Sequence, residues 1–166
     1  MNWKIATLGL GSVMVLLAAF SLSNVVMGFT AGTIHVSIPE AQLENVKMYG
    51  GEYADPVPTV VQEVGWLSCP QGQVIVREMT LPGPITVKVE LSMATATLSD
   101  VLMKAKNLSS SSGNLQNVEM WVEDVPKGLT QTIASGTMNN LETDIYFVSM
   151  DSLAYEGLAI SISVEE

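Results

Sequence analysis

Hydrophobic and polar residues alternate along most of the chain, which is the pattern of strands buried on one face. The clearest alternation covers Ile85–Met93, in which every odd-numbered residue is apolar and every even-numbered residue is polar. A period of two is typical of a half-buried antiparallel strand. The same pattern predicts further strands at 33–38, 45–49, 60–64, 73–79, 118–122, 129–134, 142–150 and 158–164.

Proline and glycine punctuate these segments and set their expected ends. Pro39 is expected to end the first strand, and Gly50–Gly51 the second. Loops or turns are predicted at 55–58, 65–72 and 81–84, and the serine-rich stretch 109–113 is predicted to be a flexible surface loop. Along 142–150, the alternation predicts that Ile145, Phe147 and Ser149 share one face.

The stretch 94–108 fits two structures. Ser99 or Asp100 could cap a short helix. Alternatively, apolar residues at 101, 103 and 105 alternate with lysines as in a strand, and this interpretation is favoured. About nine short strands separated by Gly and Pro predict an all-β chain, namely a single β-sandwich of jelly-roll or Ig-like kind.

The segment Ile5–Phe29 interrupts this pattern because it contains no ionisable side chain. As a helix it would extend about 37 Å, enough to cross a hydrocarbon core of roughly 30 Å. It is interpreted either as a signal that is cleaved or as an anchor that is retained. Lys4 precedes it and no basic residue follows until Lys47, which orients the C-terminal part outward. Small residues offer cleavage points after Ser21, Gly28 or Gly32.

This segment divides the chain into a hydrophobic N-terminal helix at 1–28 and an extracytoplasmic domain at 29–166, which is extracellular or at the cell surface. Lys4 is the only charged residue before Glu40, so the domain carries six basic and 17 acidic side chains, a formal charge of −11. Such a surface repels phosphate backbones, which argues against a nucleic-acid partner. Cys69 is the single cysteine and excludes an intramolecular disulfide.

Candidate chemistry is sparse. His35 is the only histidine, and neither G-x-S-x-G nor H-E-x-x-H occurs, so we expect no enzymatic activity and no cofactor. Glu142 and Asp144 would share one face of a strand, where they could help to hold Ca²⁺, although a solvated acidic face is the simpler interpretation. Asn107-Leu108-Ser109 is a candidate glycosylation sequon.

Several short features together resemble the TasA/camelysin family of matrix-fibre proteins and the archaeal bundling pilins. The apolar export segment leads into Phe29-Thr30-Ala31-Gly32-Thr33-Ile34-His35-Val36-Ser37, which is similar to the family's opening of Phe, a small spacer, Gly-Thr and a hydrophobic strand. The Leu81-Pro82-Gly83 turn, the run Asp100–Met103 and the final strand Leu158–Val164 also match. The resemblance implies a filament assembled by donor-strand exchange, in which copies of the chain are each other's partners.

The donor strand implied by this resemblance is the stretch from Phe29 to Ile38, with Phe29, Thr33, Ile34, Val36 and Ile38 as the assembly residues. An added strand satisfies an open sheet edge, and its alternate side chains fill pockets. Two other hypotheses remain open. One is a single-pass membrane-anchored β domain that serves as an envelope or membrane-complex subunit, with the uncleaved segment in the membrane. The other is a secreted enzyme or ligand-binding module.

Overall fold

The described residues form strands joined mostly by tight turns. The structure is a computed structural model that describes residues 25–28, 33–53, 57–80, 83, 85–124 and 127–165. Its strands are β1 Val25–Gly28, β2 Ile34–Tyr53, β3 Val57–Cys69, β4 Gln73–Thr80, β5 Thr86–Met93, β6 Thr95–Ser109, β7 Ser112–Val122, β8 Leu129–Met150, β9 Ser152–Glu156 and β10 Ala159–Glu165. The all-β prediction is confirmed. The predicted N-terminal helix lies, up to residue 24, outside the described residues.

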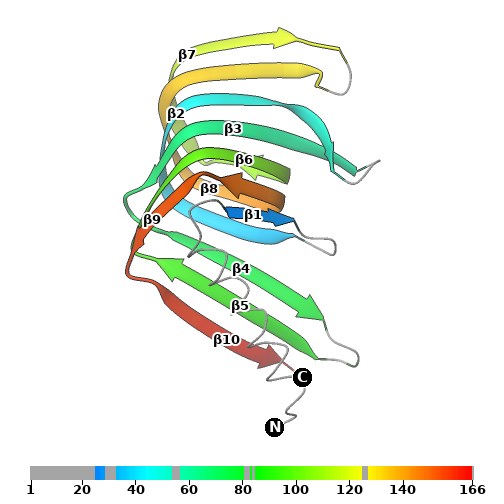
Figure 1. The fold of residues 1–166 in the computed structure, drawn as a ribbon, viewed down its shortest axis with the longest axis vertical. Coiled ribbons are helices and arrows are strands. Elements are labelled where there is room, and N and C mark those ends of the chain that lie inside the picture. The colour runs from blue at the N-terminus through cyan, green and yellow to red at the C-terminus, as the bar shows by residue number, and fades with distance from the viewer. Residues whose placement is uncertain are drawn as a thin grey trace.

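All ten strands belong to one antiparallel sheet with the order β1-β8-β6-β3-β2-β4-β5-β10, while β7 pairs with β8 and β9 with β6 (Figure 1). An additional pairing joins β8 to β2. Strands β2, β3, β6 and β8 therefore form a closed ring of neighbours. Beyond this ring, β4, β5 and β10 extend away as a flat extension toward the lower end of Figure 1.

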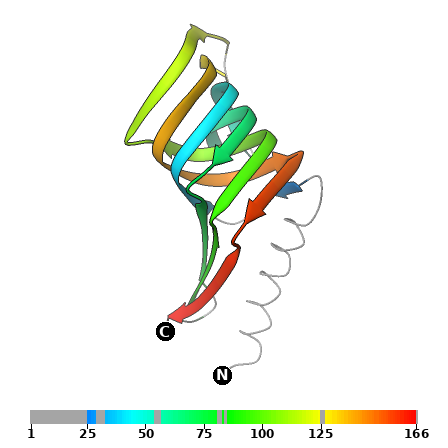
Figure 2. The same ribbon diagram turned by 90° about the vertical axis from the view of Figure 1, so that its left-hand side faces the viewer.

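The long strands turn sharply along one side of the molecule, as Figures 1 and 2 show. Asn117 of β7, Asn45 of β2 and Asp100 of β6 have φ values of 52°, 52° and 48°. The register aligns them in one row across the sheet, with Gly65 of β3 between Asn45 and Asp100. Asn, Asp and Gly tolerate the left-handed region best. Each ladder skips the pair at this row and resumes in the same register beyond it, so that single strands bend sharply and stay paired on both sides of the bend.

Several predicted strand ends are wrong, and at Pro39 and Gly65 the reason is that these residues lie at such bends. Pro39 does not end its strand: it lies opposite Asn140, whose φ is 48°, where the β2–β8 register skips a pair. The missing proline N–H is therefore not needed in that ladder. Likewise Gly50–Gly51 continues β2, and 65–69 continues β3. The turn after β3 is confined to Pro70–Gly72.

Two further predictions need correction. The serine-rich loop is only a tight turn at Ser110–Ser111, because both hydroxyls donate to the carbonyl of Asn139 at 2.8 and 3.2 Å. On β8, Tyr146 is an extra residue against β6, so the buried face shifts from Ile145 to Val148 and Met150. The strand interpretation of 94–108 is confirmed, since β6 covers it.

The core is formed by side chains on the inner faces of the ring and its extension. It is almost wholly apolar and includes a residual cavity of about 60 Å³. Two glutamines are buried beside this cavity, Gln62 and Gln73, and the Gln73 amide contacts the Met93 sulfur at 3.3 Å. The largest fully buried apolar side chains are Leu91, Ile133, Val89 and Val101.

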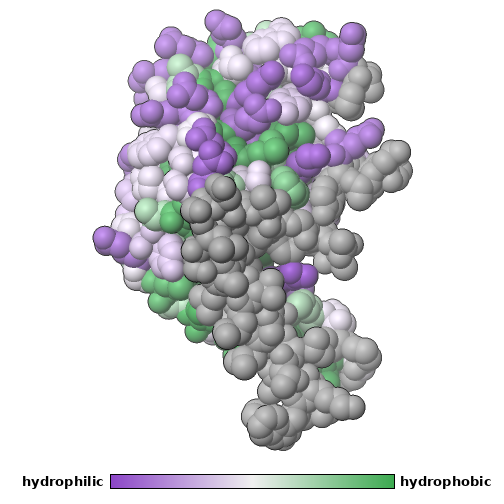
Figure 3. Space-filling view, viewed as in Figure 1, coloured by the Kyte–Doolittle hydropathy of each residue, from purple (hydrophilic) through white to green (hydrophobic). Residues whose placement is uncertain are grey.

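The outermost strands, β7 and β10, carry exposed apolar side chains. They lie at opposite ends of the long axis in Figure 1. Figure 3 shows hydrophilic residues gathered at the upper end, with hydrophobic surface between them. The exposed residues are Val118, Met120, Trp121 and Val122 on β7, Leu129 opposite them on β8, and Ile160, Ile162 and Val164 on β10.

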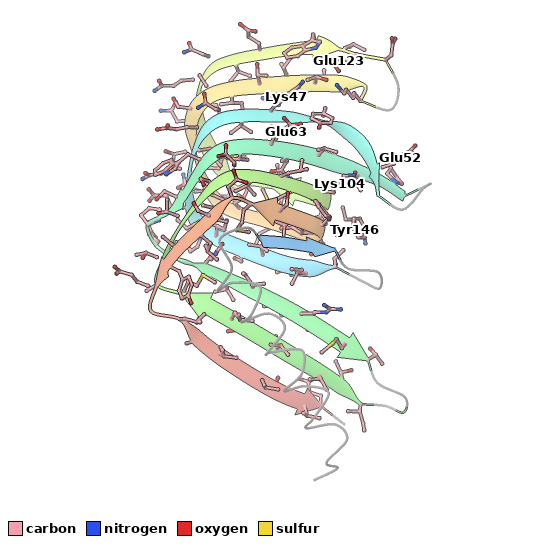
Figure 4. The ribbon with its side chains drawn as sticks, in the orientation of Figure 1. Lys47, Glu52, Glu63, Lys104, Glu123 and Tyr146 are labelled. Carbon is pink, nitrogen blue, oxygen red and sulfur yellow. The ribbon has the colours of Figure 1, made fainter. Side chains whose placement is uncertain are left out.

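A polar cluster ties β2, β3 and the β7–β8 connection together on the outer face, where Figure 4 labels Lys47, Glu63 and Glu123. Tyr49 donates to Glu63 at 2.5 Å, and the ammonium groups of Lys47 and Lys127 lie 5.4 and 5.3 Å from the Tyr49 ring centre. Burial, followed by the Glu63 hydrogen bond, raises the pKa of Tyr49 to about 12. Lys127 also pairs with Glu123 at 3.1 Å. These contacts stabilise the end of the sheet remote from the start of β2.

Candidate functional site

The start of β2 contains Ile34, Val36 and Ile38, three of the five residues predicted to form the donor strand; Phe29 lies outside the described residues. Thr33 precedes the strand and is half-buried. Ile34, Val36 and Ile38 point into the core with exposed fractions of 2%, 7% and 3%. The alternation predicted from the sequence is therefore present, and its apolar face is covered within the same chain.

This stretch is paired on both sides. On one side, residues 34–38 pair with 141–145 of β8. On the other, residues 35–37 pair with 74–76 of β4. Among the described residues, β4 pairs otherwise only with β5, and β5 only with β4 and β10. By strand pairing, the three-stranded extension is thus joined to the ring through three residues of β2, in addition to the chain connections from β3 to β4 and from β5 to β6.

The outer face of the same stretch carries a cluster of polar side chains. His35 Nε2 lies 2.7 Å from Glu142 Oε2, and His35 Nδ1 lies 2.8 Å from Asp144 Oδ1. The Ser37 hydroxyl donates to Glu142 Oε1 at 2.8 Å. The Asn107 amide donates to Asp144 Oδ2 at 2.7 Å, and its oxygen accepts from the Asp144 backbone N–H at 3.0 Å. We call these five residues the His35 cluster.

The electrostatics of the cluster favour a charged imidazole. The hydrogen bond to Asp144 raises the pKa of His35, against a smaller lowering by burial, and Glu142 raises it further. The same hydrogen bond from His35 holds the pKa of Asp144 below its usual range. With side-chain exposures of 46% for His35 and 26% for Asp144, water screens much of this attraction. The cluster therefore makes a modest contribution to stability.

Three sequence predictions meet at this cluster. Glu142 and Asp144 do share one face, but their oxygens bind His35, Ser37 and Asn107. No group of three or more His, Cys, Asp or Glu side chains suited to a metal ion occurs in the described part of the chain. Asn107, the candidate glycosylation site, is exposed, yet its amide nitrogen is engaged with Asp144.

The cluster as a unit was not predicted from the sequence. The sequence does show two pairs of residues that belong to it. His35 and Ser37 stand two residues apart, as do Glu142 and Asp144, so each pair shares one face of a strand. Their meeting depends on the β2–β8 register, which joins residues 109 positions apart and has no local signal.

Cys69 and the apolar segment complete the set of predicted features. Cys69 is fully buried, and burial raises the pKa of its thiol to about 12. Within the described residues, no helix has the length and apolar character needed to cross a bilayer. Compared with protein-family models, with curated proteins and with solved structures, the chain finds no match.

Proposed function

We propose that the chain is the structural subunit of an extracellular filament, a pilus or biofilm matrix fibre, that assembles by exchange of its N-terminal strand. One observation carries the proposal. The start of β2 is inserted between β8 and β4, and its alternate apolar side chains fill the core. In this position the start of β2 completes a sheet between two other strands.

The same stretch from a second copy would make equivalent contacts. The backbone hydrogen bonds to β8 and β4 do not depend on which chain supplies the strand, and Ile34, Val36 and Ile38 would enter the same pockets. If each copy donates its strand to the next, the contact is head-to-tail and does not close, which produces a fibre. The sandwich of jelly-roll or Ig-like kind and the export of residues 29–166 belong to this proposal, which the resemblance to the matrix-fibre proteins supports.

A pair of cysteine variants tests the exchange. Ser37 and Glu142 lie opposite each other on β2 and β8, and their side chains touch at 2.8 Å. Ser37→Cys and Glu142→Cys are made in separate chains and mixed before assembly. A disulfide between the two chains is expected in the fibres, because the paired positions then come from different copies. Buried Cys69 does not interfere, and unmixed variants serve as controls.

The double variant gives the converse test. With both cysteines in one chain, oxidation before assembly fastens the start of β2 to its own sheet. Fibres should then fail to form until a reductant is added, while the monomer stays folded throughout. Fibres that grow equally well from the oxidised double variant, or mixed fibres with no disulfide between chains, rule out exchange of this strand.

The second candidate function is a membrane-anchored β domain, favoured by the uncharged run Ile5–Phe29 after Lys4. The two functions differ in the fate of this run. The N-terminal sequence and intact mass of the native protein decide between them. A start near residues 21–32 removes the anchor and leaves filament formation, whereas an intact Met1 means a permanent anchor.

A further inference from the structure

In the His35 cluster, both nitrogens of the imidazole ring approach carboxylates, which favours the charged form of the ring. Both ring nitrogens of His35 face carboxylate oxygens, at 2.7 and 2.8 Å. A neutral imidazole has one N–H and one lone pair, so one carboxylate would face a lone pair in either tautomer. The imidazolium ion has two N–H donors: Nδ1–H hydrogen-bonds to Asp144 Oδ1, and Nε2–H faces Glu142 Oε2 at ion-pair distance, where this buried oxygen has no other hydrogen-bond partner. Hydrogen bonds from Ser37 and Asn107 hold the two carboxylates in place, so that both keep facing the imidazole of His35.

We propose that the His35 cluster is a pH-sensitive latch: the imidazolium fastens the start of β2 to β8 at acid pH, and its deprotonation loosens this stretch as the pH rises. That the loosened stretch becomes available for exchange between copies rests on the proposed function. The fastening itself does not, because it concerns the folded single chain. His35 acts here as a positioning residue.

The charges around the ring agree with this direction. Glu142 and Asp144 face His35 from β8, Glu78 of β4 and Lys88 of β5 border the same groove, and Lys106 of β6 acts on Asp144. Three carboxylates thus lie around the imidazole of His35, against two ammonium groups. The two groups in direct contact with the imidazole are both carboxylates. The surroundings therefore retain the proton on His35.

The direction of each pKa shift defines the pH window of the latch. The pKa of His35 is raised above 6.5, so its contribution is complete below pH 6.5 and is lost as the pH rises through the folded-state pKa. The pKa of Asp144 is lowered below 3.8, so its contribution is present above pH 3.8 and is lost on further acidification. The latch is therefore closed between pH 3.8 and 6.5 and opens above the pKa of His35.

The latch lies where β2 pairs with both β8 and β4. His35 is the middle residue between Ile34 and Val36, and it is one of the three β2 residues paired with β4. Loosening it from β8 affects the junction through which the β4–β5–β10 extension joins the ring. At the opposite end of β2, the contacts of Tyr49 with Glu63, Lys47 and Lys127 hold the strand independently of the His35 side chain. Opening should therefore be local to the first residues of β2.

The titration of His35 is the first test. Because the chain has one histidine, its ring protons give a single, unambiguous set of NMR signals in the full chain kept in a mild detergent. The midpoint is expected above 6.5, and it should fall toward 6.5 in the Glu142→Gln/Asp144→Asn variant. A midpoint at or below 6.5 in the unaltered chain, or one that the double variant does not lower, overturns the latch.

Amide hydrogen exchange at residues 34–38 then reports the fastening directly. After correction for the intrinsic pH dependence of exchange, the exchange rate of these amides should increase about three- to tenfold between pH 6 and pH 8.5. An increase of this size is expected when partly exposed ion pairs are lost. The increase should vanish in His35→Gln and persist in Lys127→Gln. Lys127 is a matched control, because its pair with Glu123 has exposures of 44% and 26%, against 46% and 26% for His35 and Asp144. The same increase in His35→Gln refutes the latch.

Assembly measured over the same pH range separates this inference from the proposed function. Fibre growth should accelerate above the midpoint of His35 and lose its pH dependence in His35→Gln. If the titration and exchange results hold but no fibre forms at any pH, the proposed function is wrong and the latch stands. If fibres form with a pH dependence that His35→Gln leaves unchanged, the latch does not control exchange.

Discussion

Replacement of Ile34 by alanine should destabilise the folded chain far more than the same replacement at Ile162. Ile34 is 2% exposed and borders the core cavity of about 60 Å³, whereas Ile162 on the outermost strand β10 is 44% exposed. Each buried methylene contributes about 0.8 kcal/mol, and the enlarged cavity adds to the loss. The pairing of β2 with β8 and β4 prevents the backbone from collapsing into the void. Ile34→Ala should therefore cost about 3–4 kcal/mol, and Ile162→Ala about 1 kcal/mol or less.

Urea unfolding of the full chain in a mild detergent, followed by tryptophan fluorescence, measures both costs. With an m value of about 2 kcal/mol/M, the midpoint should fall by about 1.5–2 M for Ile34→Ala and by about 0.5 M or less for Ile162→Ala. The m value should stay the same in both variants. Equal shifts in the two variants would refute the argument, because the start of β2 would then not be packed in the core of its own chain.

The remaining predictions concern single residues elsewhere. The Cys69 thiol should resist alkylation in the native protein and react after unfolding, because it is buried with its pKa raised to about 12; mass spectrometry detects the adduct. Gly72→Ala should cost about 2–4 kcal/mol in urea unfolding, since φ is +81° and the new methyl group would clash with a carbonyl of β5, whereas Gly83→Ala, at φ +104° with open space, should cost less. If the native protein carries a glycan at Asn107, Ser109→Ala should lower its intact mass by the mass of that glycan.

The strands that could be predicted from the sequence are those without bends. Gln73–Thr80, Thr86–Met93 and Ala159–Glu165 contain no residue with a left-handed backbone, and each has one side-chain alternation that a period of two detects. The stretch at β6 was also assigned correctly, because three apolar residues alternate with lysines over its middle. In such segments local pattern and tertiary structure agree.

The long strands were divided too finely, and the reason is physical. Asn45, Gly65 and Asp100 are of residue types that favour turns and caps, so a local rule starts a strand at Asn45, places Gly65 in a turn and offers Asp100 as a helix cap. In the fold these residues lie inside strands, because neighbouring strands bend together at this row and resume their pairing on both sides of it. Whether a residue with a left-handed backbone ends a strand or bends it depends on the strands beside it, and this information is non-local.

The candidate site shows the same division between local and non-local information. The apolar alternation at Ile34, Val36 and Ile38 predicts which side chains fill pockets, and it holds whether β2 completes its own sheet or that of another copy. The partners of His35 come from the register with β8, which must be the same in both arrangements if the same pockets are to be filled. The polar face therefore cannot distinguish the donor chain. What the His35 cluster can set is how readily the strand leaves, and a weak, partly exposed contact is suited to that role: it changes the rate of opening, while the buried face determines the final state.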